Sequence, residues 1–180
     1  MGFLSVKYMI IGLILGLFVG CGWIAIRYIM QNKLRVADDL TSVYGLPVIG
    51  QISGEKKKAK WFQSPYDAYT NEEQLDLIVA NVKVLMERQE KHKVFLTGDS
   101  GSERCRNMTQ QLASRLNAQG LQCEAGQSVA YDLGSISKIN EAEAVVLVEQ
   151  IDVSRYELIG KEKELCANCG IPVLGGVVVE

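Results

Sequence analysis

The chain of 180 residues contains one histidine and three prolines, and it has no excess of positive charge. With His92 as the only histidine, the sequence offers no Ser/His/Asp arrangement for nucleophilic catalysis. A net charge of −2 argues against nucleic acid as a partner. The length fits one domain with one additional segment.

The five cysteines fit a reducing compartment. Cys166 and Cys169 form a CxxC motif. A zinc site requires four ligands, and His92 lies far away in the sequence. The motif falls near the predicted end of a helix, whereas a redox thiolate is favoured at a helix start. The sequence therefore predicts a structural role for these cysteines, with no metal and no cofactor.

Acidic residues are absent from the first 30 positions, although the chain has 21 of them. Tyr8 to Ile26 is a run of 19 residues without charge, about 28 Å long as a helix, which is enough to cross a bilayer core. Trp23, Arg27 and Tyr28 at its end are typical of a membrane interface. A signal peptide would need a shorter apolar run and a small-residue cleavage site. We therefore predict that residues 1–30 form a transmembrane helix with a short outer tail.

Positive charge is concentrated after this predicted helix. Lys7 stands alone before it, whereas Arg27, Lys33 and Arg35 follow it. Because cytoplasmic flanks carry the excess of Lys and Arg, we expect a single-pass protein of the cell membrane with its C-terminal domain in the cytoplasm. The short outer tail is typical of one half of a larger split or truncated system.

Two further features indicate contacts at the membrane. Gly12, Gly16 and Gly20 share one helix face, where small residues let a second helix approach, although glycine is also common in membrane helices generally. Residues 31–70 are predicted to be a juxtamembrane linker. Its basic and aromatic side chains suit an anionic membrane surface, with a solvated flexible linker as the alternative. These side chains are Lys56, Lys57, Lys58, Lys60 and Trp61.

Hydrophobic periodicity predicts alternating helices and strands after the linker. Residues 71–91 are predicted to be an amphipathic helix that begins at an Asn71 cap and packs on a sheet. Its apolar stripe consists of Leu75, Ile78, Val79, Val82 and Leu85 or Met86. Strands are predicted at 93–97, 121–125, 144–150 and 172–179, and further helices at 103–119 and from a Ser154 cap to about residue 168.

This alternation implies right-handed crossovers and an α/β fold for residues 71–180, with a small, mostly parallel sheet and flanking helices. The stretch between 131 and 143 is expected to be irregular or weakly helical. Within the linker, Asp38 or Asp39 is predicted to cap a short helix that Gly45 ends, and residues 47–52 are expected to be extended.

Residues 94–105, VFLTGDSGSERC, have the outline of a phosphate-binding loop without its functional core. A working loop reads Gly-x-x-x-x-Gly-Lys-Ser/Thr, in which the lysine reaches the phosphates and the hydroxyl holds magnesium. Counted from Gly98, Glu103 replaces the second glycine, Arg104 the lysine and Cys105 the hydroxyl residue. A register shifted by one residue places Arg104, Cys105 and Arg106 there instead.

The sequence thus predicts a vestigial phosphate loop and no catalytic residue. The loop comprises Gly98, Ser100, Gly101, Ser102, Arg104 and Arg106. Anion binding by the two arginines at a helix N-terminus is the lesser alternative. A magnesium-holding acid is also missing, because Glu124 lies on a short polar strand, while Glu149 and Asp152 are interpreted as surface charges at a strand end.

Four stretches resemble the bacterial polysaccharide co-polymerases (chain-length determinants) joined to the tyrosine-kinase domain of their partners, the BY-kinases. DDLTSVYGLPVIGQIS (38–53) is similar to the juxtamembrane segment. SPYDAYTNEEQLDLIVANVKVL (64–85) is similar to the helix before the kinase loop, with Asn81 at the recurrent asparagine. Residues 93–120 resemble the strand, Walker A loop and helix, and residues 142–179 resemble the late strand, helix and final strand. The Walker A core is replaced, however, and the middle of the kinase domain is shortened.

The resemblance implies a degenerate P-loop-like domain in a membrane-anchored, non-catalytic component or regulator of capsular or exopolysaccharide biosynthesis, acting in chain-length control or export. Its cytoplasmic part would be a pseudokinase-like docking domain. The expected partners are further copies of the chain or the polysaccharide polymerase and kinase components. Two alternatives stay open: an atypical ATP-binding autokinase or ATPase, and a structural membrane oligomer built through the three glycines.

Overall fold

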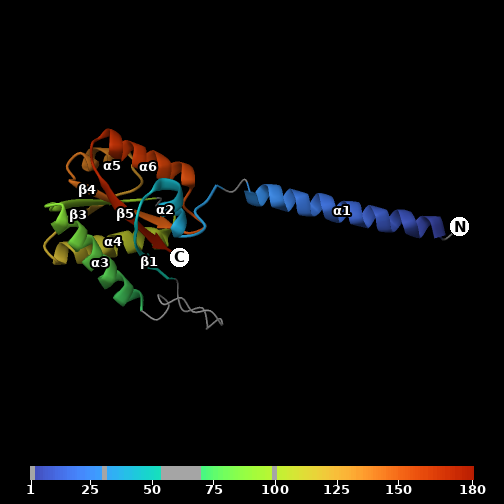
Figure 1. Cartoon of the computed structure of the whole chain (residues 1–180), viewed down its shortest axis with the longest axis horizontal. Helices are drawn as coiled ribbons and strands as arrows, with labels where there is room; N and C mark the ends of the chain where they lie inside the picture. The colour runs from blue at the N-terminus through green and yellow to red at the C-terminus, as the bar shows by residue number, and fades with distance from the viewer. Residues whose placement is uncertain (1–2, 30–31, 54–69, 99–100) are drawn as a thin grey trace. The chain divides into compact units, whose positions relative to one another are not determined.

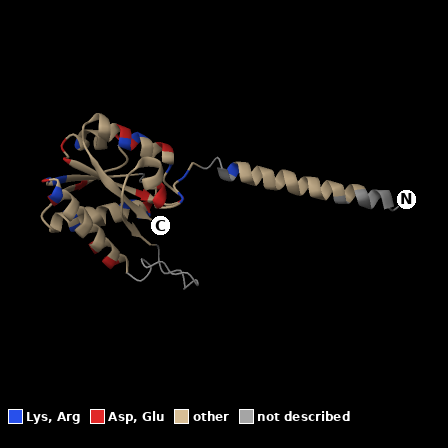
Figure 2. Cartoon of the chain, viewed as in Figure 1, with Lys and Arg blue, Asp and Glu red and all other residues tan. Residues whose placement is uncertain are grey.

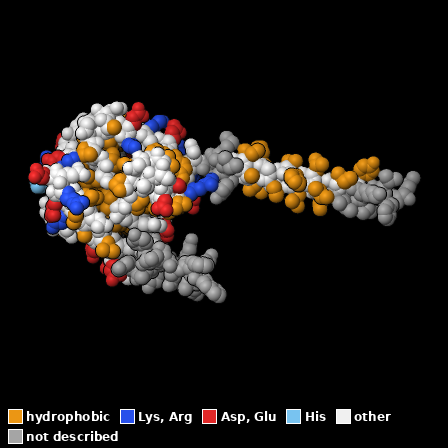
Figure 3. All heavy atoms as spheres, viewed as in Figure 1, with side chains coloured by type: hydrophobic (Ala, Val, Ile, Leu, Met, Phe, Trp, Pro, Cys, Tyr) orange, Lys and Arg blue, Asp and Glu red, His pale blue; other side chains and the backbone are white. Residues whose placement is uncertain are grey.

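The computed structural model describes residues 3–29, 32–53, 70–98 and 101–180. The chain divides into two compact units, Met1–Asn32 and Lys33–Glu180. Helix α1, Phe3–Ile29, makes up most of the first unit and includes the uncharged run Tyr8–Ile26 (Figure 1). The large apolar side chains described along it are exposed, as the space-filling view in Figure 3 shows. Among the residues that the structure describes, no helix combines the length and the apolar character needed to cross a membrane.

The second unit is built on a five-stranded sheet in the order β1-β5-β4-β2-β3. All four pairs of neighbouring strands are parallel, as the alternating pattern predicts. The strands are β1 (Val48–Ile52), β2 (Lys93–Thr97), β3 (Gln122–Ala125), β4 (Ala144–Gln150) and β5 (Val173–Val179). The helices are α2 (Asp38–Tyr44), α3 (Asn71–Arg88), α4 (Glu103–Ala118), α5 (Leu133–Ile139) and α6 (Tyr156–Asn168).

Helices cover both faces of this sheet (Figure 1). Helices α3 and α4 pack on one face, where Val94, Leu96 and Val146 contribute to the core. Helices α2, α5 and α6 pack on the other face, against Phe95 and Leu147. Successive strand residues point to opposite faces, so the continuous apolar runs Val94–Leu96 of β2 and Ala144–Val148 of β4 supply both layers. Burying each such side chain stabilises the fold by about 1.5–3 kcal/mol.

The apolar stripe of α3 is confirmed, but its cap is not the predicted residue. Leu75, Ile78, Val79, Val82 and Met86 are all buried. Thr70 occupies the N-cap and forms a capping box with Glu73, which leaves Asn71 as the first helical residue. A capping box satisfies two backbone N–H groups that the helix start leaves without partners.

Two other predicted caps are also wrong. Neither Asp38 nor Asp39 caps α2, because both are helical; Asp39 instead accepts a hydrogen bond from the backbone N–H of Val36 at 3.2 Å. Ser154 does not cap α6, which begins after Arg155. Its hydroxyl accepts from the backbone N–H of Gln150 at 2.8 Å and closes the turn after β4. The predicted end of α2 at Gly45 is confirmed, with the left-handed φ of 64° that glycine adopts at low cost.

The folded unit begins earlier than the sequence predicts. Residues 33–53 were expected to be part of a linker, yet they belong to the second compact unit. Strand β1 forms an edge of the sheet by pairing with β5, more than 120 positions later in the chain. Local periodicity carries no signal for a pairing over such a distance, which is why the sequence shows an extended segment but not its place in the sheet.

Residues 33–46, which we call the strap, cross the α6 side of the sheet. The backbone of Leu34 pairs with the turn after β4, donating to Ser154 at 2.7 Å and accepting from Asp152 at 2.8 Å. A Cβ added at Gly176 would lie 2.6 Å from the Leu40 side chain, so this glycine leaves room for the strap. Leu34 and Leu40 of the strap are themselves fully buried.

Polar contacts hold the strap to α6. The Tyr156 hydroxyl donates to the Asp39 carboxylate, and the Tyr44 hydroxyl donates to the backbone carbonyl of Tyr156. The Lys163 ammonium donates to the Tyr44 carbonyl. The strap is therefore anchored by both apolar burial and hydrogen bonds that involve charged groups.

Candidate functional site

The segment after β2 is the place where a phosphate loop would lie, and its first glycine is packed against the neighbouring strand. A Cβ added to Gly98 would lie 1.9 Å from the backbone oxygen of Val148 in β4. Real Cβ atoms do not come so close to a backbone atom, so this position requires glycine. The backbone directly after β2 is thus in close contact with β4 at the position where the phosphate loop of a P-loop fold begins.

The start of α4 is organised by Ser102. Its side chain accepts from the backbone N–H of Cys105 at 3.3 Å, so Ser102 is the N-cap of the helix. Gly101 is exposed just before it. Ser100, the remaining small residue of the predicted loop, lies outside the described residues.

The two side chains that replace the loop lysine and hydroxyl contact their own chain. The Arg104 guanidinium donates to the Ser53 carbonyl at 3.4 Å, just after β1. Cys105 is 1% exposed, and its thiol donates to the Val148 carbonyl at 3.5 Å. Magnesium takes oxygen ligands, so a buried thiol that is bonded to a backbone carbonyl does not replace the Ser/Thr hydroxyl of a working loop. Neither residue points to a phosphate in the way that a working loop requires.

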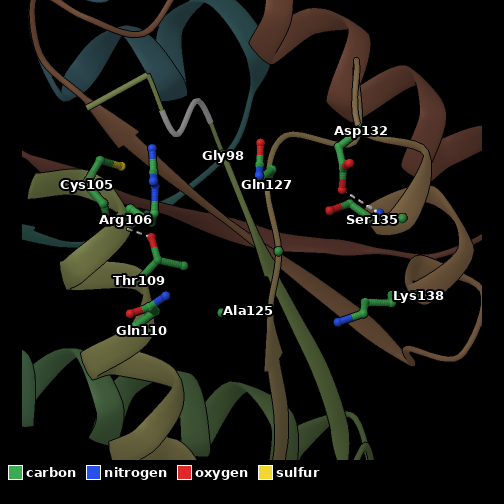
Figure 4. A pocket seen from close by; sticks show the side chains of 12 residues that line it. Gly98, Cys105, Arg106, Thr109, Gln110, Ala125, Gln127, Asp132, Ser135 and Lys138 are labelled. Carbon is green, nitrogen blue, oxygen red and sulfur yellow. Dashed lines mark hydrogen bonds between the residues drawn. The ribbon is translucent and has the colours of Figure 1, made fainter. Parts of the chain in front are cut away.

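Arg106 lines a cavity of about 360 Å³ at the loop, together with Gly98 and Cys105 (Figure 4). Helix α4 supplies Arg106, Thr109 and Gln110 to one wall of this cavity, and α5 with its preceding turn supplies the opposite wall. The ends of β2 and β3 lie between these walls. The cavity residues on the far side are Asp132, Gly134, Ser135 and Lys138, with Ala125, Gly126 and Gln127 between the walls.

Charges of both signs surround this cavity. Asp132 caps α5 by accepting from the Ser135 backbone N–H at 2.8 Å. Hydrogen bonding from the Ser135 side chain and backbone lowers the pKa of Asp132. The Lys138 ammonium lies 3.3 Å from the Glu124 carboxylate, and both side chains are largely exposed. Figure 2 shows both signs of charge distributed over the second unit in this view.

The interpretation of Glu149 as a surface charge is wrong, because its side chain is 0% exposed. It shares a face of β4 with Val145 and Leu147, which pack on the α6 side of the sheet. Desolvation raises the pKa of Tyr44, and the negative charge of Glu149 adds to this effect. Glu149 therefore faces the layer beneath the strap and not the loop, while Asp152 is exposed in the turn that follows β4.

The two cysteines of the CxxC motif have different surroundings. Cys166 is buried in α6, and burial raises the pKa of its thiol to about 12. Cys169 follows the helix and is exposed. Within the described part of the chain, no group of three or more His, Cys, Asp or Glu side chains could hold a metal ion.

The remaining predicted residues contribute structure or stay untested. Asn81 donates from its side-chain amide to the Ile49 carbonyl at 3.1 Å and so ties α3 to β1. A Cβ at Gly12, Gly16 or Gly20 would meet no atom within 4 Å. Lys56, Lys57, Lys58, Lys60 and Trp61 lie outside the described residues.

Sequence reasoning missed most of the cavity. The predicted Gly98 and Arg106 line it, but Gln127, Asp132 and Lys138 come from segments without a motif. They meet only because β3 lies beside β2 and brings the start of α5 across from α4. Asp132 at the start of a short helix was the only available local signal.

No protein-family model matches the sequence, and no curated protein matches it significantly. Among solved structures, the fold is similar to one titled "BceF Tyrosine Kinase Domain", with a TM-score of 0.56 and 11% sequence identity. The similarity covers 82% of this chain and 98% of that chain. At this identity the similarity concerns the fold alone: an α/β, P-loop-like architecture with a five-stranded parallel sheet between helices.

Proposed function

We propose that the chain is a membrane-anchored, non-catalytic component or regulator of capsular or exopolysaccharide biosynthesis. Its folded unit would serve as a pseudokinase-like docking domain for polymerase or kinase components, or for further copies of the chain. The observation that carries this proposal is a kinase-like fold in which Arg104 and Cys105, at the lysine and hydroxyl positions of the loop, contact their own chain.

Two contacts support the non-catalytic part of the proposal. Cys105 is bonded to the Val148 carbonyl, and Arg104 is bonded to the Ser53 carbonyl. Transition-state stabilisation in phosphoryl transfer depends on a lysine or arginine and a magnesium ion held against the phosphates. Here the residues at those positions have intramolecular partners instead.

Membrane attachment is proposed through α1. Its described side chains between residues 11 and 26 include no charge, and large apolar groups such as Leu13, Phe18 and Trp23 are more than two-thirds exposed. A helix with apolar side chains exposed in this way is stabilised by a lipid environment. The expected orientation keeps the folded unit in the cytoplasm, and alkaline extraction of cell membranes tests the attachment. Release of the full chain into the supernatant would contradict it.

The assignment to polysaccharide assembly rests on the resemblance of residues 38–53, 64–85, 93–120 and 142–179 to the co-polymerase and BY-kinase family, together with the similar fold. Deletion of the gene should alter the length distribution of surface polysaccharide on gels. Complementation with the wild-type chain or with Arg104→Ala should restore it, because the docking function does not require the loop. An unchanged length distribution after deletion, or failure of Arg104→Ala to restore it, would contradict the proposal.

An atypical ATPase or autokinase is the principal competing function. It predicts magnesium-dependent ATP hydrolysis or self-phosphorylation that Arg104→Ala abolishes. A purely structural oligomer instead predicts that replacing Gly12, Gly16 and Gly20 by leucine disrupts assembly and the polysaccharide phenotype together while the folded unit stays intact.

A further inference from the structure

The sheet of the second unit is open, and in the part of the chain that the structure describes its two edges are β1 and β3 (Figure 1). An edge strand presents backbone N–H and C=O groups with which a strand of another chain can pair, so an open edge promotes association. At β3, the side chain of Asn117 in α4 contacts these groups.

The register of β3 determines which of its backbone groups face outward. Gln122 and Gly126 donate their backbone N–H groups to carbonyls within or directly before β2, both at 2.9 Å. Successive residues of a strand direct their backbone groups to opposite sides, so Cys123 and Ala125 face away from β2. Cys123 lies within this outer edge and is a position at which a further strand would pair.

The Asn117 side chain bonds both outward groups of Cys123. Its Nδ2 atom donates to the Cys123 carbonyl at 2.8 Å, and its Oδ1 atom accepts from the Cys123 N–H at 2.8 Å. The amide of asparagine carries both an acceptor and donors, so it supplies the two bonds that a neighbouring strand would supply to the same residue. Asn117 therefore occupies the place of a further strand at the β3 edge.

A second copy of the chain is the partner that this edge fits. In an antiparallel pair, two opposed residues exchange both of their N–H···O bonds. A two-fold axis beside Cys123 would oppose this residue to itself, which makes the contact self-complementary. In that register the exposed Gln122 of one copy lies opposite the exposed Glu124 of the other, so no like charges are opposed.

Side chains also bond the backbone at the opposite edge of the sheet. Asn81 of α3 donates to the Ile49 carbonyl at 3.1 Å, beside the irregular register of β1. The Gln74 side chain accepts from the Ser53 N–H at 2.9 Å, directly after β1. Bulges and occupied backbone groups both hinder strand addition. At β3, two bonds from one side chain have this effect, so a single substitution opens that edge.

We propose that Asn117 is an edge guard, a side chain that keeps the β3 edge closed to strand addition by a second copy of this chain. The guard prevents the folded unit from associating through its sheet and confines contacts between copies to other surfaces. This inference does not depend on the proposed function, because it follows from the sheet and the two hydrogen bonds alone.

The test compares Asn117→Ala with the wild type and with Asn107→Ala, each as the full-length protein in non-ionic detergent. Asn107 is an exposed asparagine of the same helix and provides the matched control. Size-exclusion chromatography with light scattering measures the protein mass in the micelle over a wide range of concentration. We expect the mass of Asn117→Ala to rise with concentration to double that of the wild type, and Asn107→Ala to follow the wild type.

Hydrogen exchange of the Cys123 amide distinguishes a guard from a merely local bond. In Asn117→Ala this amide should exchange faster than in the wild type at low protein concentration and become protected again as the dimer forms. Ala125→Pro, added to Asn117→Ala, should restore the wild-type mass, because it removes an outward-facing N–H and places a ring in the path of a further strand. Asn117→Ser is a second truncation that should also double the mass.

Four results would contradict the proposal. One is an Asn117→Ala mass that equals the wild type at every concentration, and another is association that Ala125→Pro does not reverse, since the contact would then lie elsewhere. Equal association of Asn107→Ala would show that loss of any exposed amide on this helix suffices. Failure of both Asn117→Ala and Asn117→Ser to fold, measured by circular dichroism, would assign Asn117 a purely structural role.

Discussion

The contact between Gly98 and Val148 makes the substitution Gly98→Ala a direct test of how the site is built. The added Cβ would lie 1.9 Å from the Val148 oxygen and 2.7 Å from its carbonyl carbon. An ordinary carbon–oxygen contact is about 3.3 Å, so β2 and β4 would have to separate locally by roughly 1.4 Å. Both partners are backbone atoms in a paired sheet, so no side chain can turn away to relieve the overlap.

Overpacking of this kind costs about 1–3 kcal/mol where side chains can adjust, and we expect Gly98→Ala to reach about 3 kcal/mol because the backbone must move. For a folded unit of this size, such a loss lowers the melting temperature by about 6–12 °C. Urea denaturation followed by far-UV circular dichroism measures the change, with an unchanged slope showing that the unfolded state is not altered.

Gly134→Ala is the matched control for this substitution. A Cβ at Gly134, within α5, would lie 3.4 Å from an Asp132 oxygen, an ordinary contact, and its φ is not left-handed. Alanine is favoured over glycine in a helix by about 1 kcal/mol, so this variant should be as stable as the wild type or more stable. Equal stability of the two variants would refute the reasoning, because it would mean that the crevice between β2 and β4 has room for a side chain.

Three further predictions concern the strap, the start of α3 and the CxxC motif. The hydrogen bond from Tyr156 is the largest cause that holds the pKa of Asp39 below its ordinary value of 3.8. The ionised Asp39 carboxylate therefore stabilises the folded protein above pH 3.8, and this stabilisation is lost as the pH falls through the lower pKa of the folded state. Asp39→Asn should therefore destabilise the protein at pH 7, with a difference from wild type that shrinks in acid melts, whereas the exposed Asp38→Asn should behave like wild type at every pH. Thr70→Ala should cost about 1 kcal/mol in urea melts through loss of the α3 capping box, and Asn71→Ala should be nearly neutral; equal effects would contradict the observed cap. Iodoacetamide at neutral pH should alkylate Cys169 and leave Cys166 unmodified in mass spectra, since the buried thiol has a pKa of about 12; similar labelling of both would show that Cys166 is accessible.

The spacing of apolar residues predicted most of the helices and strands, because the residues that determine each of these elements are close together in the sequence. Strands β2 and β4 occupy the predicted 93–97 and 144–150, since continuous apolar runs are typical of strands buried on both faces. The α3 stripe was predicted for a similar reason, because a spacing of three to four residues is specific to a helix face. Parallel pairing followed from the alternation of these elements.

The remainder depends on contacts that sequence alone does not reveal. Thr70 and Asn71 are both good caps, and the choice between them is set by the backbone conformation of one residue. Glu149 is polar at a strand end, yet its side chain is fully buried. Strand β1 takes its place only through pairing with β5, and the cavity exists only because α4 and α5 begin on either side of β2 and β3.

The sequence predicted a vestigial loop because the lysine and hydroxyl residues of a working loop are missing. In the structure, the side chains at those two positions have partners within the chain. Replacement of the lysine and hydroxyl positions left open whether Arg104 or Arg106 had taken over phosphate binding. The structure places Arg104 against Ser53 and Cys105 against Val148, while Arg106 lines the cavity at the loop. Membrane attachment and the docking role stay predictions.

Calorimetric titration of the full-length protein with ATP and ADP, with and without magnesium, tests the central claim most directly. The account predicts no magnesium-dependent binding at millimolar nucleotide, because the residues at the lysine and hydroxyl positions are engaged within the chain. Magnesium-dependent binding that Arg104→Ala abolishes would contradict this account, since it would show that the loop still holds a nucleotide.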